Sequence, residues 1–334
     1  MQEKINVRNR GLDFLKFVAT IFITNSHFVP LYPEKLKFLA TFGVHGDALF
    51  YFTSGYLLMM GLCKQNECFS FWMKKRIRRL WPASIIWVIV TAIIWNIPID
   101  WKALVFASRY WFVWCITIYY VLLYMIVFYL KKTKQEMMQI KYIYIATIIL
   151  ALCVVPFIPW YIGSIYHSDF NSFCHFSIFL LGGILYLKKD HIIQRPITFD
   201  LAMLLIMYFI YTISVSYGKG HEGTRYYVQL LGYLPLHAFC YHAYQISCRP
   251  WTNLLFNIKG AKWIFIILSS LTLEIYIVQW QLITPFFNNL FPLNLIIVFT
   301  IIVGSAYLLK IAVNIFLQLW TTEPFCLRDC YRLN

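Results

Sequence analysis

Residues 293–320 read LNLIIVFTIIVGSAYLLKIAVNIFLQLW. One charge, Lys310, interrupts this run of apolar residues. A helix needs about 20 apolar residues to cross the hydrocarbon core of a bilayer, so the run predicts a transmembrane helix. Because Lys310 has no obvious partner nearby in the sequence, we interpret it as a structural residue or one whose side chain reaches towards the membrane surface.

The whole chain shares this apolar character. Of its 334 residues, 60% are hydrophobic and 19% are aromatic, and the mean hydropathy is +0.65. A soluble protein of this composition would expose large apolar patches and aggregate, whereas a bilayer accepts helices that are apolar on all sides. We therefore expect an all-α, polytopic membrane protein whose main surroundings are the lipid bilayer.

Nine further apolar runs are separated by loops that contain charged residues, proline or glycine. The chain thus predicts about ten transmembrane helices, which form one membrane domain over residues 1–334. The sixth and eighth runs are the weakest, and a broken or re-entrant segment is the alternative for each. The expected helices cover residues 12–31, 43–63, 81–99, 111–130, 141–163, 173–187, 199–217, 226–244, 263–287 and 293–320.

The basic residues are distributed unevenly between the loops. The N-terminus and every second loop hold about 21 Lys and Arg residues, and the alternate loops hold about 6. Lys and Arg accumulate on the cytoplasmic side of membranes, so this pattern predicts an even number of spans with both termini cytoplasmic. The formal charge of +15 does not indicate a nucleic-acid partner, because the basic residues occupy short loops and do not gather on one face.

The nine cysteines indicate neither a disulfide scaffold nor a metal cofactor. No CxxC pair is present, and only Cys326 and Cys330 are close enough to hint at a metal site or a bridge. Most of the others lie in apolar runs, where cysteine usually behaves as a small buried hydrophobe.

The first apolar run contains a stripe of polar residues. Lys16 and His27 are eleven residues apart, which places them within about 20° of each other around a helix and about 16 Å apart along its axis. Asp13 lies one turn before Lys16 and can pair with it. Charged groups in hydrocarbon are costly, so we expect this stripe to face the protein interior.

His27 and Asp47 are expected at a similar depth, because each lies about four residues from the outer end of its run. A carboxylate that accepts a hydrogen bond from one imidazole nitrogen makes the other nitrogen more basic, as a general base for a hydroxyl requires. The sequence therefore predicts His27, Asp47 and Lys16 as catalytic residues. The alternative is a histidine that only satisfies a helix contact.

Two further segments are candidates for ligand binding. Glu274 lies on a second polar stripe with Gln281, for which interhelical packing is the alternative explanation. The segment FWMKKRIRRLWP, residues 71–82, is an amphipathic stretch ahead of the third span, with Pro82 expected in the first turn of that helix. Its role is either headgroup attraction or binding of a phosphate-bearing ligand through paired guanidinium groups. The basic residues concerned are Lys75, Arg76, Arg78 and Arg79.

Four stretches together resemble the membrane-bound acyltransferase-3 family, whose members acylate cell-envelope glycans. They are RGLDFLKFVATIFITNSH with Lys16 and His27, GDALFYFTSGYLL with Ser54, Gly55 and Tyr56, KKRIRRLWP, and LTLEIYIVQWQ. The likeness is good over the first third of the chain and looser over the remainder. Two departures are lysine at Lys16, where arginine is more common, and Gln279 at a position where many members have histidine.

The resemblance implies acyl transfer from cytosolic acyl-CoA, commonly acetyl-CoA, to a hydroxyl of a surface or lipid-linked glycan. It implies a multi-pass protein of the cytoplasmic (inner) membrane of a bacterium, with no metal. His27 would then be a general base or a transient acyl carrier, and the basic residues of 75–79 would hold the CoA phosphates. Glu274, Ser54 and Tyr56 are the candidates for substrate binding. The sequence leaves the acyl group, the acceptor and the oligomeric state open.

Two other functions fit parts of the pattern. Intramembrane Asp, Lys, Glu and His residues also build the proton relays of secondary transporters and flippases. The paired Gly- or Pro-interrupted helices that such proteins often contain in corresponding halves are missing from this sequence. The third possibility is a structural membrane subunit. In that case, neutralising Lys16 and His27 would leave the phenotype intact.

Overall fold

The computed structural model describes residues 9–105, 110–154, 169–220, 228, 231–320 and 324–333, and all regular structure in these ranges is helical. The long helices are α1 (Arg10–His27), α2 (Gly43–Lys64), α3 (Phe69–Trp95), α5 (Trp111–Lys132), α6 (Ile140–Val154), α7 (Asp169–Leu187), α8 (Ile197–Gly220), α10 (Tyr233–Ser247), α12 (Ala261–Ser270), α13 (Thr272–Leu282) and α14 (Leu293–Leu319). The short helices are α4 (Trp101–Val105), α11 (Pro250–Leu255) and α15 (Leu327–Cys330). The 3₁₀ segments are η1 (Val29–Leu31), η2 (Glu34–Leu39), η3 (Met137–Gln139), η7 (Lys189–His191) and η8 (Pro285–Leu290).

Four described helices, α3, α5, α8 and α14, are long and apolar enough to cross a membrane. The pair formed by α12 and α13 counts as a fifth if it is taken as one bent span. Each of the ten predicted segments overlaps a described helix, although parts of the fifth and the eighth lie outside the described residues. The all-α class is confirmed, whereas the number ten and the cytoplasmic position of both termini remain predictions.

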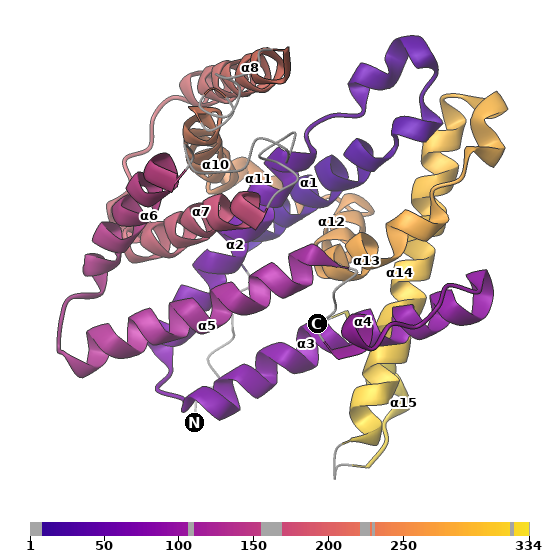
Figure 1. Ribbon diagram of the computed structural model, residues 1–334, viewed down its shortest axis with the longest axis horizontal. Coiled ribbons are helices and arrows are strands. Elements are labelled where there is room, and N and C mark those ends of the chain that lie inside the picture. The colour runs from indigo at the N-terminus through magenta and orange to yellow at the C-terminus, as the bar shows by residue number, and fades with distance from the viewer. Residues whose placement is uncertain are drawn as a thin grey trace.

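Helix α2 packs along both α1 and α7 near the centre of the bundle (Figure 1). The contact with α7 depends on two glycines. A Cβ at Gly55 would lie 1.9 Å from the carbonyl oxygen of Phe179, and one at Gly182 would lie 2.0 Å from that of Phe52. Small residues at such points let helix backbones approach closely in membranes, so van der Waals packing along the whole interface becomes possible. The sixth predicted span, at 173–187, is therefore a core helix.

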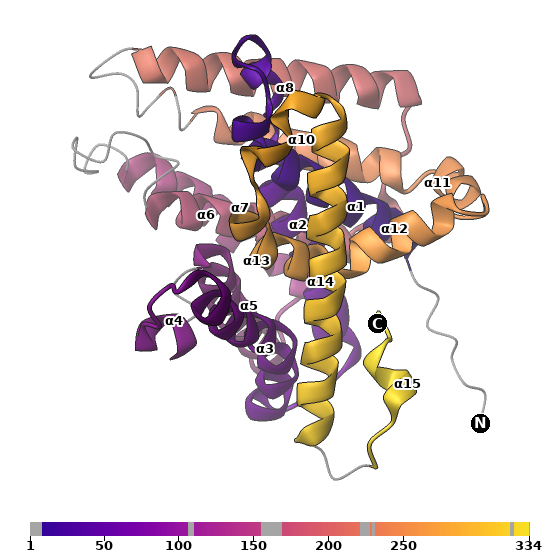
Figure 2. The same ribbon diagram turned by 90° about the vertical axis from the view of Figure 1, so that its right-hand side faces the viewer.

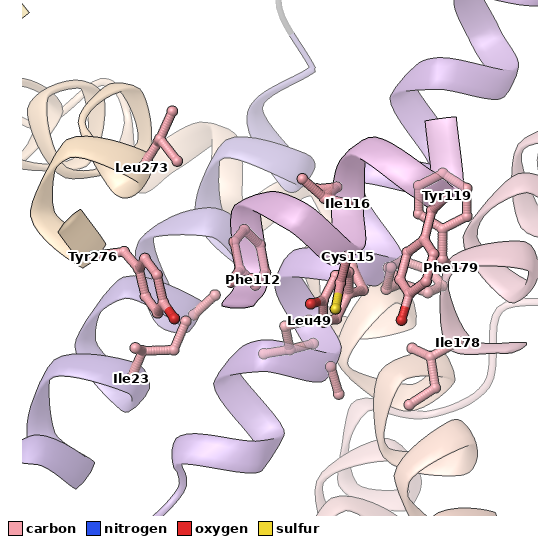
Figure 3. Close-up of a cluster of buried hydrophobic side chains, with 14 of the residues drawn as sticks. Ile23, Leu49, Phe112, Cys115, Ile116, Tyr119, Ile178, Phe179, Leu273 and Tyr276 are labelled. Carbon is pink, nitrogen blue, oxygen red and sulfur yellow. The ribbon is translucent and has the colours of Figure 1, made fainter. Parts of the chain in front are cut away.

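Buried apolar side chains from five helices meet beside this interface (Figure 3). Phe112 of α5 packs against Tyr276 of α13 with ring centroids 5.2 Å apart, and Tyr119 packs against Phe179 at 5.5 Å. Leu49 of α2 is fully buried among them. Tilted aromatic pairs of this kind contribute about 0.5–1.5 kcal/mol each beyond their buried area. They join α13 and α7 to α5.

The two ends of the bundle are defined by contacts between distant segments. At one end, Arg10 at the start of α1 donates to Asn257 Oδ1 at 3.0 Å. The C-terminus of α2 and the N-terminus of α3 lie at this end, which we call the basic end. At the other end, Asn288 and Asn294 donate to the carbonyl oxygens of Pro30 and Leu31, at 2.8 and 2.9 Å. The helices α1 and α14 therefore run in opposite directions (Figure 2).

The expected single helix over 263–287 is wrong. The chain bends by 80° between α12 and α13, and α13 ends at Leu282 before Pro285. Hydroxyl groups weaken the helix at the bend, because Ser269 donates to the carbonyl of Ile266 and Thr272 donates to that of Leu268. The sequence did not predict a break in this ninth span.

The start of the third helix also differs from the prediction. Helix α3 begins at Phe69, so residues 71–82 form its first turns, and Pro82 lies inside the helix. Proline within a helix removes one backbone hydrogen bond, but membrane helices tolerate this where neighbouring groups compensate. The basic residues of this segment therefore have fixed directions around a helix.

Replacing Gly55 by Ala should lower the stability of the protein, because the new methyl group collides with backbone atoms of α7. Overpacking of this kind costs about 1–3 kcal/mol. The thermal midpoint of the purified protein in detergent measures the effect. The control is Gly304→Ala in α14, where a Cβ meets no atom within 4 Å and the midpoint should not fall. Equal midpoints for the two variants would contradict the proposed close contact.

Candidate active site

The polar stripe of α1 faces α13. Helix α1 begins after Asn9, whose side chain caps it by accepting from the backbone N–H of Leu12 at 3.2 Å. The hydroxyl of Thr20, on the same face as Lys16 and His27, lies 3.1 Å from that of Thr272 at the start of α13. Further along, the ring of His27 packs against Trp280 of α13, with centroids 4.5 Å apart. Lys16 and His27 are both half-buried, so the stripe lies at a helix interface.

No hydrogen bond joins His27 to Asp47 among the described residues. The reason is the register between the two antiparallel helices. A Cβ at Gly43 would meet Ser26 and one at Gly46 would meet Ile23, so Asp47 lies level with the residue before Ile23. His27 is five residues further on, about 7 Å along the axis. The sequence placed the two side chains at equal depth because it extended the first span to residue 31, whereas α1 ends at His27.

Asp47 lies instead among tyrosines and unpaired polar atoms. Its carboxylate interacts electrostatically with Tyr51, one turn further along α2, and with Tyr276 of α13. Asp47 Oδ1 and the Tyr51 hydroxyl are buried without a hydrogen-bond partner. The amide of Gln279, which is fully buried, has no partner for either its oxygen or its nitrogen.

Such a concentration of unsatisfied groups is unusual. Nearly all buried polar groups in proteins are hydrogen-bonded, because an unpaired one costs about 1–3 kcal/mol. We call His27, Asp47, Tyr51, Tyr276 and Gln279 the inner polar cluster. Its members come from α1, α2 and α13, and α1 packs against both of the other helices. The unpaired atoms are suited to hydrogen bonds with a polar ligand.

Glu274 does have a partner. Its Oε1 lies 3.3 Å from the ammonium of Lys310 on α14; the Glu274 side chain is buried, and that of Lys310 is 14% exposed. Lys310 therefore does not extend to the membrane surface, and the two residues form an ion pair that joins α13 to α14. On the same helix, Gln281 accepts a hydrogen bond from the indole of Trp87 at 3.0 Å. The second polar stripe of the sequence is thus occupied by contacts between helices.

The four predicted CoA-binding residues of α3 divide into two groups. The guanidinium groups of Arg76 and Arg79 both interact electrostatically with Tyr120 on α5, so they share the side of α3 that faces the bundle. Arg76 also lies over the ring of Trp72, and its Nε has no hydrogen-bond partner. The other two residues are placed differently. Lys75 pairs with Glu67 at 2.5 Å, and Arg78 lines a groove between α3 and α14.

The Ser-Gly-Tyr segment of α2 lies towards the basic end. Gly55 provides the close contact with α7 already described. Tyr56 is buried, and its hydroxyl accepts a hydrogen bond from Tyr244 of α10 at 3.3 Å. Ser54 is half-buried. Asp47 is about 13 Å away from Tyr56 along the helix axis, so Tyr56 lies closer to the basic end than Asp47 does.

Two buried histidine clusters were not predicted. Asp200 of α8 binds His242 of α10 at 2.9 Å and also pairs with Arg249. His237 lies 2.7 Å from the hydroxyl of Ser177, and its Nδ1 contacts the carbonyl oxygen of Tyr233 at 2.7 Å. The sequence contained one signal for the first cluster, because Asp200 stands at the start of an apolar run and a buried carboxylate needs a partner. The partner itself is 42 residues away.

Within the described ranges, no group of three or more His, Cys, Asp or Glu residues is arranged to hold a metal ion. Cys326 and Cys330 are free thiols, and Cys330 lies near the carbonyl oxygen of Cys326 at 3.8 Å.

Replacing Lys310 by Met should destabilise the protein strongly, because it leaves Glu274 buried without its partner. Breaking a buried ion pair in this way costs about 3–5 kcal/mol. The double variant Glu274→Gln/Lys310→Met should recover much of the loss in thermal midpoint. If Glu274→Gln instead left stability unchanged but abolished activity, the carboxylate would be a substrate ligand and not a packing contact.

Comparison with known proteins identifies the family. A family profile described as Acyltransferase domain (Acyl_transf_3) matches residues 9–315. No curated protein and no solved structure shows significant similarity to the chain. The matched residues extend from the N-cap of α1 into the last turns of α14, so they include all the long helices and the inner polar cluster. The chain therefore belongs to this family of membrane acyltransferases.

Proposed function

We propose that the protein transfers an acyl group, such as acetyl, from cytosolic acyl-CoA to a hydroxyl of a cell-envelope or exported glycan. We place the protein in the cytoplasmic membrane of a bacterium, as a single membrane domain over residues 1–334. The transfer takes place at His27, within the helix bundle.

The observation that supports this proposal most is the set of unpaired polar atoms on α2 and α13, the two helices that pack against the helix of His27. The imidazole has a ring contact with Trp280 but no described hydrogen bond, so a ring nitrogen is available for a ligand. Asp47 Oδ1 and the Gln279 amide, on the two neighbouring helices, also have no partner. A sugar is rich in hydroxyl groups, which both donate and accept hydrogen bonds and therefore match such a set.

In the proposed reaction, His27 takes the proton of the acceptor hydroxyl while the oxygen attacks the thioester carbonyl carbon. The new C–O bond forms and the C–S bond breaks, so the electron pair of that bond leaves with sulfur. The imidazolium then returns the proton to the departing thiolate, and His27 is regenerated. Alternatively, an imidazole nitrogen attacks the carbonyl carbon and the C–S bond breaks, which releases CoA as a thiolate. The acceptor oxygen then attacks the acyl group, the C–N bond breaks to free His27, and the hydroxyl proton passes to the thiolate.

Asp47 acts on this reaction as a positioning residue. It lies about 7 Å from His27 along the helix axis, so the two side chains do not contact each other directly. A substrate hydroxyl between them can contact both. Lys16, further along the α1 stripe towards the basic end, contributes positive charge on the path that an anionic donor would follow. Ser54, Tyr56 and Glu274 are weaker candidates for substrate contacts, because Tyr56 and Glu274 already have protein partners.

The CoA phosphates bind to Arg76 and Arg79 in this proposal. Both guanidinium groups lie on the side of α3 that faces α5, and the unpaired Nε of Arg76 is a donor available for a phosphate oxygen. Lys75 contributes long-range positive charge, although its ammonium is paired with Glu67. Arg78 lies outside this group, on the surface near α14.

Substituting His27 by Ala should reduce acyl transfer by about 10²–10⁴-fold, the usual contribution of general acid–base catalysis. The assay follows label from acetyl-CoA into an envelope glycan fraction with the purified protein. His191→Ala, which removes an exposed histidine of η7, should retain full activity. Undiminished transfer by the His27 variant would exclude both proposed roles.

The two roles of His27 differ in one measurable species. Incubation with labelled acyl-CoA in the absence of acceptor should leave label on His27 only if the residue is an acyl carrier. Peptide mass spectrometry after rapid quenching detects this adduct. Its absence, together with loss of activity in His27→Ala, assigns the residue as a base.

Replacing Arg76 by Ala should raise the KM for acyl-CoA by about 10–100-fold with a smaller effect on kcat, because a charge-assisted hydrogen bond contributes about 1.5–3 kcal/mol. Steady-state kinetics over a range of acyl-CoA concentrations measures this change. Arg328→Ala, which removes an exposed arginine of α15, is the control and should leave KM unchanged. An unchanged KM in Arg76→Ala would refute the assignment of this face of α3.

A further inference from the structure

A groove of about 750 Å³ lies between the first half of α3 and the last turns of α14, outside the proposed active site. The two helices are neighbours at this point (Figure 2). The groove wall is mostly apolar, with Met73, Ile77 and Ile85 from α3 and Phe316 and Trp320 from α14. Trp320 is 72% exposed, so the groove opens to the surface of the bundle.

Two basic side chains, Lys74 and Arg78, belong to the same wall. They are four residues apart on α3, so they lie one above the other and can both approach a single ligand group. Neither has an ion-pair partner in the described ranges, and no acidic residue lines the groove. Lys75, by contrast, is neutralised by Glu67.

The groove therefore combines a long apolar surface with two uncompensated positive charges, which lie in the first three turns of α3. Helix α3 begins at the basic end of the bundle, and the loop charges predict that this end faces the cytoplasm. We infer that the groove between α3 and α14 binds one anionic glycerophospholipid. Its phosphate lies between Lys74 and Arg78, and an acyl chain lies along Ile77, Ile85 and Phe316.

The chemistry of this wall favours an anionic lipid over a zwitterionic one. The positive choline group of phosphatidylcholine would be repelled by Lys74 and Arg78, whereas the headgroup of phosphatidylglycerol carries no positive charge. Each basic residue near a membrane surface contributes about 1 kcal/mol to the binding of anionic lipid, so the two together should raise the affinity about 30-fold. Tryptophan is enriched at the membrane–water interface, where lipid headgroups lie. Trp81 and Trp320 both line the groove.

Two faces of α3 therefore have different ligands. Arg76 and Arg79 face Tyr120 and the bundle, whereas Lys74 and Arg78 face α14 and the lipid. The lipid site does not depend on the proposed reaction, since none of its residues belongs to the inner polar cluster.

Native mass spectrometry of the delipidated full-length protein, titrated with phosphatidylglycerol or with phosphatidylcholine of the same chains, tests the inference. The protein should bind one phosphatidylglycerol about 30-fold more tightly than phosphatidylcholine. The double variant Lys74→Gln/Arg78→Gln should lose this preference. A matched double variant, Lys259→Gln/Lys262→Gln, neutralises two exposed lysines near α12 and should keep it.

Other results would overturn the inference. Equal binding of the two lipids by the unaltered protein, or an undiminished preference in Lys74→Gln/Arg78→Gln, would do so. Stronger competition by a polyprenyl phosphate than by phosphatidylglycerol would also overturn it, because the occupant would then be a lipid carrier. If the glutamine variant does not fold, Met73→Trp, which fills the groove and keeps both charges, should lose bound lipid instead.

Discussion

The close approach of α2 to its two neighbours is the contact on which the rest of the bundle depends. Gly46 allows the backbone of α2 to approach α1, and Gly55 with Gly182 does the same for α2 and α7. In a bilayer the hydrophobic effect does not drive helices together, so tight packing of this kind must supply much of the association energy. The same contact fixes the register of α1 against α2, and with it the position of His27 relative to Asp47.

The buried carboxylates Glu274, Asp200 and Asp47 differ in whether a charged partner is present. Glu274 with Lys310, and Asp200 with His242 and Arg249, are satisfied by residues on neighbouring helices. These pairs offset the cost of placing charge in a low-dielectric interior, and they join helices that are distant in sequence. The unpaired atoms of the inner polar cluster receive no such compensation, so they are the groups that a substrate can satisfy. This contrast distinguishes Asp47 from the paired carboxylates of Glu274 and Asp200.

Helix α3 shows how one basic segment can serve two surroundings. Because residues 71–82 are helical, successive basic side chains point in different directions instead of forming one diffuse patch. Arg76 and Arg79 face the bundle, and Arg78 faces the groove beside α14. A loop of the same composition would provide positive charge without this division. Extending the helix through Pro82 therefore has a consequence for recognition, since it separates a proposed CoA site from a proposed lipid site.

The sequence determined the helical class and the location of most helices, because the apolar length that a bilayer requires is a local property of the chain. Helix α14 and helix α5 lie within two residues of their predicted ends. The polar stripe with Lys16 and His27 was also readable, since residues eleven apart share a face on any α-helix.

Tertiary structure alone decided which of these polar groups meet. Glu274 and Lys310 are 36 residues apart, and their pairing depends on the bend at Leu271 and on how α13 packs against α14. The separation of His27 from Asp47 follows from where α1 ends and from the glycine contacts that set its register with α2. Helical periodicity fixes the direction of a side chain around its own axis, but it contains no information about the sliding and rotation of one helix against another. Only the packing of the complete bundle supplies these.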